Sequence, residues 1–348
     1  MTSQHLDPAT LITALYCLVD DLYREQFASR KPSRPGRRPQ LSDSEVLTLM
    51  LLGQWRADRS ERAFLSYAEV YLRSFFPKLL SQSAFNRRAR DLMGVVCAMG
   101  PAISQQAIRL LGLPQAAYEV LDGVPVPLMR RCRGERHRLF RDEAGIGRGG
   151  SDREWFYGIK MLGVVDAHGF FTGFVAGPAN TEERWLAEAL LRWRQDPTAP
   201  EPTAAQLATV LGPTHRKGGR RQGPTGPLGP RTGVGRPSPT PAIADLGYTG
   251  RDQHWRSNYH AEVLTQDAYR SLDEDARPQA VRWLNGLRQR VETAFARLDA
   301  SFGLKFPRAR TLLGLRARLG AKVAAFNFAT YFNHLLGRPP FSACRPLG

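Results

Sequence analysis

Two short apolar segments that each contain an aspartate followed by a turn constrain this chain more than any other feature. Residues 118–126 read YEVLDGVPV and residues 242–248 read AIADLGY. Each pattern predicts a buried strand that is stopped by glycine or proline soon after the acid. A carboxylate at the end of such a strand is held on a rigid element, as a catalytic or metal-binding group must be. The alternative is that Asp122 only caps the turn that follows it.

A third acid, Glu292, lies in a helix predicted over residues 278–302, at the margin of its apolar stripe. Arg288 precedes it by one turn, so Glu292 could be an ordinary boundary residue paired with that arginine. Together with Asp122 and Asp245, however, it gives three carboxylates on separate elements. Mg²⁺ takes oxygen ligands, and two such ions about 4 Å apart support in-line attack on phosphorus. The three acids therefore predict a metal-dependent phosphoryl-transfer site.

The charge balance indicates the class of partner. The chain has 348 residues, enough for two domains, with 49 Lys plus Arg against 32 Asp plus Glu, a formal net charge of +17. Such an excess favours a polyanion, either nucleic acid or an anionic membrane surface. No apolar run approaches the ~20 residues that span a bilayer, and there is no signal-peptide pattern. The four cysteines show no zinc-type spacing. We therefore predict a cytoplasmic protein that binds nucleic acid and no membrane.

Residues 1–112 are predicted to be entirely helical. Helices are expected over residues 9–28, from the capping box that begins at Ser42, and over 60–76 and 81–98, with a further short helix after a break at Gly100-Pro101. The helices over 60–76 and 81–98 could form a helix-turn-helix that presents Arg87, Arg88 and Arg90 to DNA. A helical bundle with a solvated basic face explains the same pattern equally well.

The rest of the chain predicts a mixed α/β sheet that follows the helical domain. Arginines crowd the segment after Asp122, and phosphate contact is at least as good an explanation as solvation for this cluster, which includes Arg130, Arg131 and Arg133. Strands are expected over 155–165 and 170–175, with Asp166 in the hairpin turn between them. A helix over 181–194, a strand over 261–265 and a last helix over 312–336 complete the pattern. Residues 196–241 form an insert rich in Pro, Gly and Arg that we predict to be disordered, above all from 213 onwards.

Four sequence blocks resemble successive blocks of bacterial insertion-sequence DDE transposases, chiefly the groups numbered four, five and nine-eight-two. They are LDGVP at 121–125, YGIK at 157–160, ADLGY at 244–248 and RQRVETAF at 288–295, and the helical leader is also similar. Two positions depart from the group-four pattern, because Asn285 replaces its tyrosine and Asp299 its lysine.

The resemblance implies a ribonuclease-H-like catalytic domain over residues 113–338, with Asp122, Asp245 and Glu292 as catalytic and metal-binding acids. It implies two Mg²⁺ ions, which Mn²⁺ could replace, and DNA cleavage with strand transfer at the inverted-repeat ends of the element. Double-stranded DNA would be contacted by Lys160 and Arg288 besides the arginines named above. A homodimer on DNA, in the bacterial cytoplasm at the nucleoid, is expected. Two alternatives stay open: a nuclease or resolvase that only hydrolyses, and a catalytically silent DNA-binding descendant.

Overall fold

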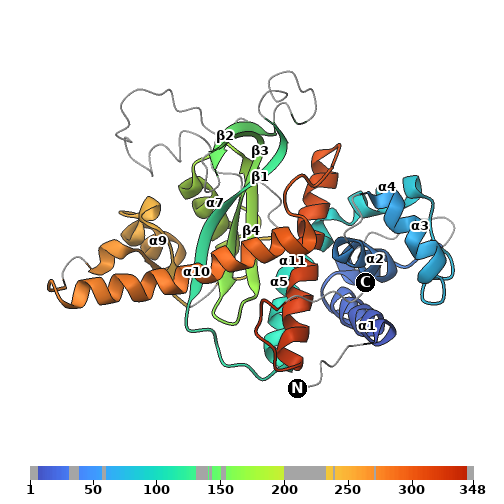
Figure 1. Cartoon of the computed structure of the whole chain (residues 1–348), viewed down its shortest axis with the longest axis horizontal. Helices are drawn as coiled ribbons and strands as arrows, with labels where there is room; N and C mark the ends of the chain where they lie inside the picture. Colours follow the sequence, from blue (N-terminus) through green and yellow to red (C-terminus); the bar gives the residue numbers. More distant parts are fainter. Residues whose placement is uncertain are drawn as a thin grey trace. The chain divides into compact units, whose positions relative to one another are not determined.

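The computed structural model describes residues 7–30, 39–56, 60–130, 140, 143–149, 154–199, 233–237, 240–269 and 272–342 (Figure 1). The chain divides into two compact units: Met1–Leu111 together with Arg297–Gly348, and Gly112–Ala296. The first division falls after Leu111, one residue before the predicted boundary at 112/113. The C-terminal residues, which we had expected in the catalytic domain up to residue 338, belong to the helical unit instead. None of the helices in the described ranges is long and apolar enough to cross a membrane.

The helical unit contains three short helices that begin at a serine cap, together with longer helices. Its elements are α1 (Pro8–Gln26), α2 (Asp43–Trp55), α3 (Glu61–Tyr71), α4 (Gln82–Asp91), α5 (Met93–Leu110), the end of α10 (Ala276–Phe302) and α11 (Leu312–Leu335). Ser42, Ser60 and Ser81 each accept a hydrogen bond from the backbone N–H three residues later, and Ser42 forms the predicted capping box with Glu45. Such caps satisfy N–H groups that the first helical turn leaves free.

Close packing explains why α11 joins this unit. A Cβ on Gly100 of α5 would lie 2.8 Å from Val323, and one on Gly320 of α11 would lie 2.8 Å from the backbone of Cys97. The two helices therefore approach each other where neither has a side chain. The predicted break at Gly100-Pro101 was wrong: α5 continues through Pro101, and the break falls at Leu92, between α4 and α5. Asn327 of α11 donates to the Gly100 carbonyl at 2.8 Å, which stabilises this region of α5.

The second unit is organised around a mixed sheet. Its strands are β1 (Glu119–Arg130), β2 (Gly145–Gly149), β3 (Glu154–Asp166), β4 (Phe171–Pro178), β5 (Ala242–Ile243) and β6 (Val263–Leu264). Among the described strands, β3 pairs antiparallel with β1 along one edge and with β4 and β2 along the other. On the far side of β1, β5 and β6 add in parallel. Two helices, α7 (Glu183–Gln195) and α9 (Asp252–Tyr259), belong to the same unit.

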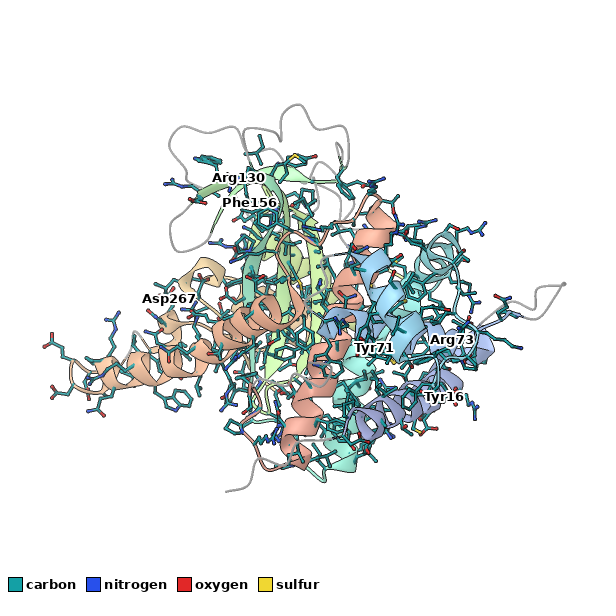
Figure 2. All side chains as sticks on the ribbon, turned by 45° about the vertical axis from the view of Figure 1, so that its right-hand side comes forward. Tyr16, Tyr71, Arg73, Arg130, Phe156 and Asp267 are labelled. Atoms are coloured by element: carbon teal, nitrogen blue, oxygen red, sulfur yellow. The ribbon has the colours of Figure 1, made fainter. Side chains whose placement is uncertain are left out.

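The strand that carries Asp122 is longer than predicted. We expected Gly123 and Pro125 to end it, whereas β1 continues to Arg130, with an irregularity between Pro127 and Met129. The reason is that β5 pairs only with the first two residues of β1. Beyond them β1 is an edge strand, where proline is tolerated because one side needs no N–H donor. Arg130 pairs with Phe156 at the far end of this ladder, where Figure 2 shows the two side by side.

Helices α7 and α10 cover opposite faces of the sheet (Figure 1). Leu121, Leu162 and Ala244 pack in one buried cluster with Leu186 and Leu190 of α7. Side chains alternate along a strand, so the intervening residues face the other way. Gly163, between Leu162 and Val164, accordingly leaves room for Phe295 of α10, which would lie 2.8 Å from a Cβ there.

Part of the predicted disordered insert is packed against this sheet. Val234 is 2% exposed and lies in the α7 cluster, and its carbonyl accepts a hydrogen bond of 2.6 Å from Arg194 Nε. Ala199 is buried as well. The prediction of disorder over 196–241 was therefore wrong for residues 196–199, 233–237 and 240–241. The composition of the insert could not indicate this packing, because the buried Arg194, which needs the Val234 carbonyl as an acceptor, lies outside the insert. Residues 200–232 and 238–239 lie outside the described residues.

Candidate active site

Asp122 lies within β1, and Asp245 lies two residues after the end of the neighbouring parallel strand β5, where its side chain caps the 3-10 helix Leu246–Tyr248. Glu119 pairs with Ala242 and Val120 with Ile243, an offset of 123 residues in both pairs. Extended by two residues, the same register carries Asp122 onto Asp245. Neighbouring strands are about 4.8 Å apart, and paired residues face the same side of a sheet. Two aspartates 123 residues apart in sequence are thus neighbours, on the face opposite α7.

Arg288 of α10 contributes positive charge to this pair. Burial raises the pKa of Asp122 to about 7, and the nearby Glu183 and Asp245 charges add to the rise. The Gly123 N–H, which donates to Asp122 Oδ1 at 2.8 Å, and the Arg288 guanidinium act in the opposite direction. Arg288 Nε is buried and has no hydrogen-bond partner among the described residues. A half-buried guanidinium beside two carboxylates can accept a further anion, such as a phosphate oxygen.

Glu292 lies on α10 one turn after Arg288, as predicted, and its side chain is exposed. Within the described part of the chain it forms no hydrogen bond or ion pair, so the alternative of a simple pair with Arg288 is not what the structure has. The two side chains point to neighbouring positions on the helix surface. Glu292 is thus placed near Arg288 by the helix, and among the described residues it does not form a three-acid group with Asp122 and Asp245.

A group that the sequence analysis missed adjoins the aspartates. Glu183, the first residue of α7, pairs with Lys160 at 3.1 Å and accepts a 3.4 Å hydrogen bond from the Tyr248 hydroxyl. A Cβ on Gly123 would lie 2.7 Å from Glu183 Cδ, so glycine is needed for the carboxylate to lie there. Lys160, predicted to bind DNA, is therefore paired within the protein. The signal that could have found Glu183 is weak: an acid in the first turn of a helix is common.

Asp166 is a turn residue, as predicted, but a deeply buried one. Its Oδ1 accepts from the backbone N–H groups of His168 and Phe170 at 3.0 and 2.9 Å, which closes the turn between β3 and β4. Its side chain does not belong to the Asp122 pair. Burial raises the pKa of Asp166 to about 7, and the charge of Glu119 adds to this effect.

The predicted DNA-binding arginines fall into three groups. Arg88, predicted to bind DNA, pairs with the buried Asp43 at 2.5 Å and donates to the Leu41 carbonyl, so its guanidinium is used within the helical unit. Arg87 and Arg130 are exposed, and Arg90 is half-buried. Arg131 and Arg133 lie outside the described residues.

Two aspartates with oxygen ligands on adjacent strands fit a hard divalent cation such as Mg²⁺. Among the described residues, no group of three or more His, Cys, Asp or Glu side chains is arranged to hold a metal ion. The fit to Mg²⁺ therefore rests on Asp122 and Asp245. Glu292 would have to approach them, or DNA oxygens would have to supply the remaining ligands.

The chain was compared with protein-family models, with curated proteins and with solved structures, and none of the three comparisons gave a match.

Proposed function

We propose that this protein is a DDE-type transposase that cleaves and transfers DNA strands at the ends of an insertion element. The observation that carries the proposal is the parallel register that makes Asp122 and Asp245 neighbours, beside the guanidinium of Arg288. Further support comes from the strand order, in which an antiparallel β1–β3–β4 ladder is extended in parallel by β5 and β6. That order is the one expected of a ribonuclease-H-like domain.

The residues divide the chemistry between them. Asp122 and Asp245, with Glu292, would hold Mg²⁺, which in such reactions activates the attacking oxygen and stabilises the leaving oxygen. Arg288 has a planar fork with an unpaired buried Nε, suited to two oxygens of the phosphate beside the scissile bond. The exposed arginines of the chain supply salt-dependent affinity for the DNA backbone.

The test is strand cleavage of a labelled duplex that carries the DNA flanking the coding sequence, with Mg²⁺, Mn²⁺ or EDTA. Asp122→Asn, Asp245→Asn and Glu292→Gln should each abolish cleavage and strand transfer while DNA binding is retained. Asp252→Asn is the control, because Asp252 is exposed on α9. Full activity of either aspartate variant would exclude that residue from the site. Cleavage without strand transfer would indicate a nuclease, and DNA binding without cleavage would indicate a silent descendant.

A further inference from the structure

A cavity of about 760 Å³ lies within the helical unit, whereas Asp122, Asp245 and Glu292 belong to the other unit. Its walls come from α2, α3, α4, the last turn of α10, α11 and the segment between α10 and α11. All of these residues belong to the same compact unit. The volume falls in the range of small-molecule sites, about 300–1,000 Å³.

The lining carries a marked excess of positive charge. Its ionisable side chains are six cations and two acids: Arg56, Arg90, Lys305, Arg308, Arg318 and Lys322, with Glu61 and Asp299. Both acids are already paired, Glu61 with Arg318 at 3.3 Å and Asp299 with Lys305 at 3.2 Å. Arg318 and Lys305 are the cations of these two pairs, so an anionic ligand would chiefly meet Arg90 and Lys322, neither of which has a carboxylate partner in the lining.

One of these cations, Lys322, is buried inside the helical unit. It is 6% exposed, and its ammonium donates to Gln54 Oε1 at 2.8 Å and to the Phe302 carbonyl, both of them neutral acceptors. Burial and then the charge of Arg318 lower the pKa of Lys322 to about 7. A buried ammonium without a carboxylate partner costs free energy that a bound anion would offset.

The remaining walls are apolar and partly aromatic. Trp55, Phe64 and Phe85 line the cavity, and Phe306, half-exposed with a φ of 54°, stands in the segment after α10. Trp55, Phe64 and Phe85 are almost fully buried, so Phe306 supplies the exposed aromatic ring. An exposed ring beside guanidinium groups suits a planar ligand ring that bears an anionic group. A phosphate alone would leave the aromatic surface unused.

We propose that this cavity is a nucleotide-binding site, which takes the base and the phosphate of a single nucleotide. The nucleotide is either free or displaced from a DNA strand, because both present the same chemistry. The proposal does not depend on Asp122, Asp245 or Glu292. Its outcome is therefore independent of whether the chain is a transposase.

The test uses the full chain and two probes. Isothermal titration with deoxyadenosine monophosphate, deoxyadenosine and inorganic phosphate measures the free form. A duplex with one unpaired 2-aminopurine, compared with the paired duplex, reports by fluorescence on a displaced base. Saturable binding of the monophosphate, tighter than of either part alone, supports the free ligand. A protein-dependent change in the unpaired probe alone supports the displaced one. Absence of both signals overturns the proposal.

Two variants connect either signal to the cavity. Arg90→Ala should weaken binding on the order of tenfold, since it removes a charged donor from the lining. Ala300→Trp should reduce binding similarly, because Ala300 is an exposed lining residue and an indole would occupy the space. Arg62→Ala is the matched control, an exposed arginine of α3 outside the lining. Equal affinity of all three variants for the monophosphate or the probe would place the ligand elsewhere and contradict the proposal.

Discussion

Arg88 of α4 is held by Asp43, the first residue of α2, at 2.5 Å, and Asp43 also accepts a 2.5 Å hydrogen bond from the Tyr23 hydroxyl of α1. The Arg88 and Asp43 side chains are only 20% and 4% exposed. Three helices that the sequence predicts separately thus share one carboxylate. Of the arginines of α4, Arg88 is therefore structural, whereas Arg87 faces solvent.

We therefore expect Arg88→Ala to destabilise the protein by about 1–3 kcal/mol, because Asp43 would lose a charged partner. Arg87→Ala, on the exposed side of the same helix, should change stability by less than about 0.5 kcal/mol. If Arg87 contacts DNA, that variant should lower the log–log salt slope of binding by about 0.9. Urea unfolding and binding at several salt concentrations measure the two effects. A stability loss that is the same for both variants would contradict this division.

Arg288→Lys should keep the protein folded but reduce strand transfer at least tenfold. Lysine preserves the positive charge near Asp122 but cannot present two parallel donors to a phosphate. We would measure strand-transfer rates and melting temperatures for the wild type, Arg288→Lys and Arg290→Lys. Arg290 is a suitable control because it donates to the Ala167 carbonyl at the β3–β4 turn and not to Asp122 or Asp245. Wild-type rates for Arg288→Lys would show that only the charge is needed.

The aspartate pair was predictable from the sequence because a strand pattern followed by glycine is a local signal. Glu183 was not, since its position depends on Gly123 lying opposite the start of α7, a contact between residues 60 positions apart. The packing of Val234 was hidden for a similar reason: Arg194 needs an acceptor that only the folded chain supplies. The length of β1 could not be predicted from residues 118–130, because it depends on β5 pairing with only the first two residues of β1.

Gly123→Ala tests the link between β1 and Glu183. The new methyl group would displace the Glu183 carboxylate from Lys160 and Tyr248, at a cost of about 0.5–1.5 kcal/mol. In a Glu183→Ala background the same substitution should cost much less, because no carboxylate remains to be displaced. A double-mutant cycle in urea gives the coupling energy. Additive effects would mean that the two residues do not interact.

Asp166→Asn and Asp166→Ala should separate charge from hydrogen bonding. The pKa of Asp166 is raised, so ionisation weakens the folded state progressively as pH rises from about 4 to about 7. Asparagine keeps the Oδ1 acceptor without the charge, so this variant should gain stability relative to wild type at pH 8 but not at pH 4. Alanine leaves two turn N–H groups without their acceptor and should cost about 1–3 kcal/mol at both pH values. Urea unfolding at pH 4 and pH 8 measures these stabilities. If Asp166→Asn gains no stability over wild type between pH 4 and pH 8, the pKa of Asp166 is not raised.

The buried pair of Arg194 and Glu119 leads to the last prediction. Their charged groups lie 2.9 Å apart with side chains 4% and 5% exposed, and Arg194 also holds the Val234 carbonyl. Removing one partner leaves a buried charge, so Arg194→Met should cost about 3–5 kcal/mol.

Deleting residues 214–239 should also destabilise the protein, because it removes Val234, whereas a deletion that ends at residue 230 keeps this contact. The difference between the melting temperatures of the two deletion variants measures how much the packed residues around Val234 contribute to stability. Equal melting temperatures for both deletions would show that Val234 contributes nothing, and Arg194 would then need another acceptor to stay buried.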